Sequence, residues 1–181
     1  MTFIAGVDEV GRGCLAGPVI AAAVVLKTNM PGLRDSKKLS QKKREELSSS
    51  IMQNSYFSFG SASVEEIDSI NILQASLLAM KRAILNLSVE PGKVLVDGIH
   101  KPDIDIDTQA IIGGDSIVDE ISAASIIAKV YRDDLMMQFD KKYPNFYFSS
   151  HKGYGTKLHK AAIKKHGITP IHRKTFKGVI V

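Results

Sequence analysis

Acidic side chains follow three apolar segments of this chain, and carboxylates grouped in this way can hold divalent cations. Asp8 and Glu9 come directly after one apolar run, Asp97 closes a second, and Asp115 follows a third. Ligand sites in open α/β sheets lie at strand ends, so we expect these acids to converge in one crevice. Close carboxylates repel one another, and Mg²⁺ or Mn²⁺ removes that penalty through oxygen ligands. The pattern favours metal-dependent phosphodiester cleavage.

Each of these acids also has a simpler interpretation. A single acid after a strand is commonly a turn residue, and Asp115 could cap a following helix. Neighbouring residues of a strand point to opposite faces, so Asp8 and Glu9 share a site only if the chain turns there. Gly11 and Gly13 permit such a turn.

The glycine-rich stretch 11–16 matches G-x-G-x-x-A, which is the fingerprint of dinucleotide-binding folds. That fingerprint needs a helix after the glycines, whereas Pro18 and the β-branched residues beyond it predict a strand. Asp8 and Glu9 would also repel a pyrophosphate. We therefore expect the glycines to let the backbone approach a sugar-phosphate chain, and Cys14 to be a small packing residue.

Charge is distributed unevenly along the chain. Residues 1–140 have a net charge of −5, whereas residues 141–181 have a net charge of +10 and contain no acid. Aromatic rings interleaved with these cations at 143–154 suit a nucleic acid, although a solvated basic face is the alternative. We expect Phe146 and Phe148 in the core, Tyr154 between its two glycines as an exposed contact, and the lone histidines as surface groups or phosphate contacts.

Composition narrows the class of protein. The chain has 181 residues, 44% hydrophobic and 24% charged, which is typical of one globular domain. No apolar stretch reaches the ~20 residues that cross a bilayer, and no basic residue precedes Asp8, so we expect neither a membrane span nor a secretory signal. The single cysteine excludes a disulfide framework and favours a cytoplasmic location.

Periodicity predicts an α/β domain with a mixed sheet and a helical C-terminal region. Ser40 is expected to cap a helix, Ser63 and Glu66 form a capping box, and Gly167 is expected to stop the last helix. Predicted strands cover 3–7, 18–26, 56–62, 93–98 and 109–114; predicted helices cover 40–53, 71–87, 121–139 and 156–166.

Several motifs in this order resemble those of the bacterial ribonuclease HII family, the type 2 ribonucleases H. The resemblance covers nearly the whole chain and depends on the joint order of motifs that are individually unspecific. These are Gly6-Val-Asp8-Glu9-Val-Gly11-Arg12-Gly13, Leu15-Ala-Gly-Pro18, Asp35-Ser-Lys37-Lys-Leu39, Val96-Asp97-Gly98, Gly114-Asp115, Ser122-Ala-Ala-Ser125-Ile-Ile-Ala-Lys129 with Arg132-Asp133, and His151-Lys-Gly-Tyr154-Gly-Thr156.

The resemblance implies an endonuclease that cuts the RNA strand of RNA–DNA hybrids. It also implies cutting 5′ of ribonucleotides embedded in duplex DNA, which leaves a 5′-phosphate and a 3′-hydroxyl. The implied architecture is an RNase H-like core over 1–140, with a basic, mostly helical region over 141–181 packed on it and contributing to substrate binding. The implied cofactor is Mn²⁺ or Mg²⁺.

The resemblance also assigns roles by position. Asp8, Glu9, Asp97 and Asp115 match the metal-binding catalytic carboxylates. Gly11, Arg12 and Gly13 match a loop that senses the 2′-hydroxyl, and Tyr154 matches a tyrosine that packs on the adjoining deoxyribose. Ser36, Lys37 and Arg173 match positions near phosphates.

We expect the protein to be a monomer that binds nucleic acid and does not associate with a membrane. The chain ends soon after Phe176, which leaves little room for the clamp-binding tail that some relatives carry, so we do not count a sliding clamp among the expected partners. A nucleic-acid-binding protein without catalysis is the alternative from another class, although it has no need of clustered carboxylates. A junction resolvase is the nearer enzymatic alternative, against which the adjacent Asp8 and Glu9 and the Gly-Arg-Gly loop argue.

Overall fold

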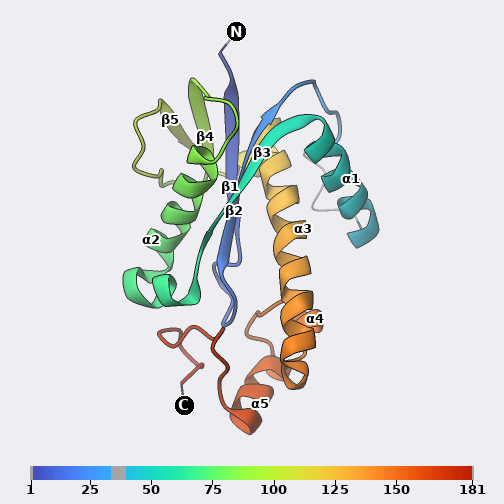
Figure 1. Ribbon diagram of the computed structural model, residues 1–181, viewed down its shortest axis with the longest axis vertical. Helices are drawn as coiled ribbons and strands as arrows, with labels where there is room; N and C mark the ends of the chain where they lie inside the picture. The colour runs from blue at the N-terminus through green and yellow to red at the C-terminus, as the bar shows by residue number, and fades with distance from the viewer. Residues whose placement is uncertain (1, 34–39, 181) are drawn as a thin grey trace.

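One mixed sheet organises the described part of the computed structural model, residues 2–33 and 40–180 (Figure 1). The strand order is β3-β2-β1-β4-β5. The strands are β1 (Ile4–Val10), β2 (Val19–Leu26), β3 (Ser55–Ala62), β4 (Lys93–Asp97) and β5 (Thr108–Ile111). The helices are α1 (Gln41–Gln53), α2 (Val64–Leu85), α3 (Asp119–Lys142), α4 (Phe148–His151) and α5 (Lys157–His166), with short 3₁₀ turns η2 (Gly114–Ser116) and η3 (Pro144–Phe146).

The central strand β1 pairs in both senses. It runs antiparallel to β2 and parallel to β4, so β1 and β4 end at the same edge of the sheet. The sequence pattern predicted that β1 stops at Val7, and this was wrong. Pairing with β2 continues through Asp8, Glu9 and Val10, so the two acids lie inside the strand.

Helices cover both faces of the sheet (Figure 1). The alanines and valines of one face pack against α2, and those of the other face pack against α3 and α1. Gly6 allows α3 to approach β1 closely, because a Cβ at Gly6 would lie 2.1 Å from the backbone carbon of Glu120. The N-terminal end of α3 is therefore fixed against the strand that carries Asp8.

The C-terminal part of the chain contributes most of a separate apolar cluster beyond the sheet, at the foot of α3 (Figure 1). Phe146 and Phe148 are buried there, as predicted, and they pack with Leu15, Met136 and Ile163. Helix α3 runs continuously through residue 140 and links this region to the sheet. Within the described residues, no helix has the length and apolar character needed to cross a membrane.

The predicted helix caps are confirmed. Ser40 accepts the N–H of Lys43, and Ser63 and Glu66 form the reciprocal capping box. Helix α2 is kinked at Asn71, which has a φ of 67° and whose side chain caps the second segment. The periodicity had indicated a restart at this residue.

Candidate active site

Asp8 and Asp97 are neighbours on two parallel strands. The pairing of Val7 with Val96 places the next residue of each strand side by side at the sheet edge. Asp8 is only 7% exposed. Burial raises the pKa of Asp8 well above its ordinary value, and repulsion from Glu9 and Asp97 raises it further, against hydrogen bonds from Ser125 and from the Glu9 N–H. An ionised Asp8 is therefore costly unless a cation joins it.

Asp115 is attached to the same site through its backbone. Its N–H donates to Oδ1 of Asp97 at 3.3 Å, and its carbonyl accepts the hydroxyl of Ser122 from α3. Its own Oδ1 accepts the hydroxyl of Ser116 at 3.2 Å. The turn η2 thus brings the third acidic segment beside Asp97, as the sequence pattern predicted.

Glu9 approaches the site from the other face of the sheet. Because neighbours in a strand alternate, Asp8 interacts with Ser125 of α3, whereas Glu9 lines a cavity of about 290 Å³ beside α2. Asp97 and Arg12 line the same cavity, and Arg12 forms an ion pair with Glu9 at 3.0 Å. Asp97 therefore acts on Asp8 and lines the same cavity as Glu9, although the chain makes no turn between Asp8 and Glu9.

The donor set fits a hard divalent cation. Asp8, Glu9, Asp97 and Asp115 offer only oxygen ligands, which suits Mg²⁺ or Mn²⁺. Across residues 2–33 and 40–180, no group of three or more His, Cys, Asp and Glu side chains is arranged so that it could hold a metal ion by itself. Mg²⁺ is ordinarily held by one or two carboxylates together with water and substrate phosphates. The Asp8–Asp97 pair presents two carboxylates of the kind that such a site uses.

Two buried arginines hold the glycine-rich loop that follows β1. Arg173 donates to the carbonyls of Gly11, Arg12 and Gly17 at 2.7, 2.8 and 2.9 Å. Arg132 of α3 donates to the carbonyls of Ala16, Pro18 and Lys152 at 3.1, 3.1 and 2.9 Å. Both side chains are fully buried.

Arg173, which we expected near phosphates, is fully buried in this structure. The three hydrogen bonds of its guanidinium go to carbonyls of the glycine-rich stretch, so in this structure it shapes the loop. Gly11 is required at its position, since its φ is 93° and a Cβ would lie 2.1 Å from Nε of Arg132. Arg12 and Gly13 at the loop tip are exposed.

Tyr154 lies next to this loop. Its backbone pairs with Cys14 in an isolated bridge, and its side chain is 42% exposed, as expected from its two flanking glycines. Cys14 is fully buried and packs as predicted. Ser36 and Lys37 lie outside the described residues.

The histidine prediction was wrong for three of the four C-terminal histidines. His151, His159 and His172 are buried beside Phe148, and only His166 is exposed among the four. Sequence reasoning also assigned no role to Ser125 and Arg132, both of which lie within the motif that carried the resemblance.

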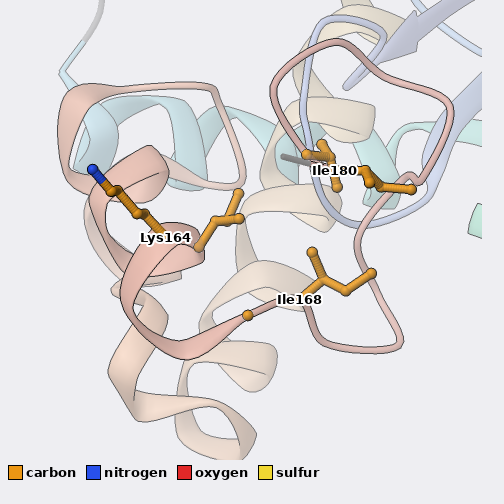
Figure 2. Close-up of a pocket in the computed structure, with 6 residues that line it drawn as sticks. Lys164, Ile168 and Ile180 are labelled. Atoms are coloured by element: carbon orange, nitrogen blue, oxygen red, sulfur yellow. The ribbon is translucent and has the colours of Figure 1, made fainter.

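A second hollow, of about 340 Å³, lies at the C-terminal end of the described chain (Figure 2). Lys164 and Ile168 line it from α5 and the turn after it, and Ile180 lines it from the final segment. None of the candidate site residues contributes to this largely apolar hollow.

The mixed five-stranded sheet, with acids on adjacent parallel strands and helices on both faces, defines an RNase H-like fold. Two solved structures share it over nearly the whole chain. The ribonuclease H2 of Pyrococcus horikoshii OT3 has a TM-score of 0.81 at 27% identity, covering 98% of this chain and 95% of that one. The RNase HII of Archaeoglobus fulgidus, solved in complex with PCNA, has a TM-score of 0.83 at 27% identity, covering 97% and 95%.

The family described as Ribonuclease HII matches residues 5–179. Ribonuclease HII of Coxiella burnetii (strain RSA 493 / Nine Mile phase I) is 59% identical over 180 residues, covering 98% of this chain and 89% of the relative. That of Borrelia recurrentis (strain A1) is 56% identical, covering 97% and 99%. This chain belongs to the ribonuclease HII family, and it is a ribonuclease H enzyme that cleaves the RNA strand of RNA–DNA hybrids.

Proposed function

We propose that this ribonuclease H also cuts duplex DNA on the 5′ side of a single embedded ribonucleotide. Water attacks the phosphorus, the bond to the upstream 3′ oxygen breaks, and the products carry a 5′-phosphate and a 3′-hydroxyl. The observation that carries the proposal is the buried Asp8, whose pKa is raised by burial and by Glu9 and Asp97. Such a group favours a bound cation, and that cation would in turn attract a phosphate of the substrate to this edge of the sheet.

Asp8 and Asp97 are the proposed principal metal ligands, with Glu9 and Asp115 completing the set. A bound Mg²⁺ or Mn²⁺ stabilises the negative charge that develops on the phosphate during in-line displacement. The protein contributes the rigid positions of the two carboxylates, which follow from strand pairing.

The glycine-rich loop and Tyr154 are the proposed readers of the ribonucleotide. The exposed tip at Arg12 and Gly13 is available to the 2′-hydroxyl, and Tyr154 is available to the adjoining deoxyribose. The acid-free region 141–181, with a charge of +10, would hold the backbone of the duplex. We propose it as a substrate-binding region packed on the core of residues 1–140.

The test is a cleavage-site map on a DNA duplex that carries one ribonucleotide, with both product ends identified. We expect one cut 5′ to the ribonucleotide, and at least a hundredfold slower cutting by Asp97→Asn. Asp105→Asn, an exposed acid outside the site, is the matched control and should cut as the wild type does. Near-wild-type cutting by Asp97→Asn in Mg²⁺ would refute the assignment of that carboxylate.

A further inference from the structure

Three histidines that the proposed chemistry does not use are buried together. They come from α4, from α5 and from the segment after α5. The ring of His151 stacks on that of His159 with centroids 4.4 Å apart. The Nε2 atoms of His159 and His172 lie 3.1 Å apart, and both of these side chains are fully buried. Two imidazoles share a hydrogen bond only if one donates and the other accepts.

Backbone groups at both ends fix the direction of this bond. The N–H of Thr169 donates to Nδ1 of His172 at 2.9 Å, so the ring proton of His172 resides on Nε2. That proton is donated to Nε2 of His159. The proton of His159 therefore resides on Nδ1 and is donated to the carbonyl of Tyr154 at 2.9 Å. The chain of hydrogen bonds runs from Thr169 to Tyr154 and requires two neutral rings.

An additional proton disturbs this chain. On His159 it sets two N–H groups against each other. On Nδ1 of His172 it faces the N–H of Thr169, and the hydroxyl of Thr169, 2.8 Å away, is the acceptor on that side. Consistently, burial lowers the pKa of His159 and of His172 to about 4, with repulsion between the histidines as a further cause. The charged groups acting on the cluster are Asp140 of α3 and Lys152, both through His151.

The chain of hydrogen bonds ends where the candidate site begins. The Tyr154 carbonyl accepts from His159 and from the N–H of Thr156, while the Tyr154 N–H donates to the carbonyl of His151. Tyr154 and His172 also pair with Cys14 and Ala16 of the glycine-rich loop. The histidine pair thus joins the two segments that flank that loop.

We propose that His159 and His172 are positioning residues for Tyr154, whose backbone they hold against the glycine-rich loop so that its ring meets the substrate. This role rests on the proposed substrate contact of Tyr154. Because the pair lies apart from the carboxylates, its loss should affect substrate engagement more than the chemical step.

The first test observes the imidazole protons of the wild-type protein by long-range ¹H–¹⁵N NMR at pH 7. We expect the Nδ1–H tautomer for His159 and the Nε2–H tautomer for His172. An Nε2–H tautomer of His159 would overturn the hydrogen-bond chain, whether or not any variant folds.

The second test compares two variants that each keep one of the two bonds of His159. The amide of Asn in His159→Asn reaches the position of Nδ1 and can still donate to Tyr154, whereas Gln in His159→Gln reaches the position of Nε2 and keeps only the bond from His172. We expect His159→Gln to raise KM for the single-ribonucleotide duplex about tenfold with little change in kcat. His159→Asn should stay within about threefold of wild type.

A purely structural role predicts the opposite order, because Gln fills more of the buried space than Asn. Equal KM values for the two variants, or a higher value for His159→Asn, would overturn the proposal. In a Tyr154→Ala background the difference should vanish, and its persistence would also overturn it. A wild-type KM for Tyr154→Ala would show that Tyr154 does not contact the substrate and would overturn this proposal as well. The nuclease assignment is tested separately, because loss of activity in Asp97→Asn supports it whatever the result for Tyr154.

Discussion

Replacing Arg173 by methionine tests whether the buried guanidinium holds the glycine-rich loop. The side chain donates to three carbonyls, those of Gly11, Arg12 and Gly17, at distances between 2.7 and 2.9 Å. Methionine has a similar length and no donor, so all three carbonyls lose this partner in a buried setting. Each loss costs roughly 1–3 kcal/mol, and removing the buried charge offsets part of the sum.

We therefore expect Arg173→Met to lower the free energy of unfolding by about 3–5 kcal/mol. For a domain of this size that corresponds to a fall in Tm of about 6–20 °C, measurable by calorimetry or circular dichroism. Arg173→Lys keeps the charge but not the fork of donors, so its Tm should lie in between. Lys174→Met, at the exposed neighbouring residue, is the control. An unchanged Tm for Arg173→Met would refute the reasoning.

Three further predictions follow from buried groups near the sheet edge and in the C-terminal region. In the unfolded chain the histidines bind protons near pH 6.5, whereas the folded His159 and His172 bind them only near pH 4. The free energy of unfolding should therefore fall by about 2–3 kcal/mol per histidine as pH drops from 6.5 to 4. A free energy from urea unfolding that does not change with pH across this range would contradict this prediction. Asp8→Asn should raise the Tm of the metal-free protein at pH 7, because burial and the neighbouring acids raise the pKa of Asp8 and its ionised form therefore destabilises the fold. A lower Tm for Asp8→Asn would contradict this reasoning. Gly6→Ala should lower the Tm by more than about 5 °C, because its Cβ meets the α3 backbone at 2.1 Å, and a wild-type Tm would show that α3 can move away without cost.

Local signals predicted those features of the fold that depend on a few neighbouring residues. The caps at Ser40 and Ser63 require only a side chain and the next turn of helix, so the sequence pattern identified both. The proximity of Asp8 and Asp97 also followed from a general rule, because parallel strands end at one edge of the sheet.

Features that depend on residues far apart in the chain were not predicted from the sequence pattern. The length of β1 is set by pairing with β2, and an apolar pattern that stops at Val7 does not carry this information. Arg132 and Arg173 are charged and were therefore not expected inside, yet they bind carbonyls more than 110 residues away along the chain. Their burial depends on the position of those carbonyls, which only the assembled fold determines.

The histidines illustrate the same difficulty. A lone imidazole is most often exposed, and nothing in the spacing of His159 and His172 indicates that one donates to the other. The pair becomes apparent only when α5 and the segment after it pack on Phe148.

The most direct test of the account is a calorimetric titration of Mn²⁺ into the substrate-free protein and into Asp97→Asn, with Asp105→Asn as the control. If Asp8 and Asp97 form the metal site, Asp97→Asn should bind Mn²⁺ at least about tenfold more weakly than the wild type, with a metal-free Tm no lower than that of the wild type because its repulsion of Asp8 is gone. Equal Mn²⁺ affinity in the wild type and in Asp97→Asn would contradict the assignment of this carboxylate pair as the catalytic metal site.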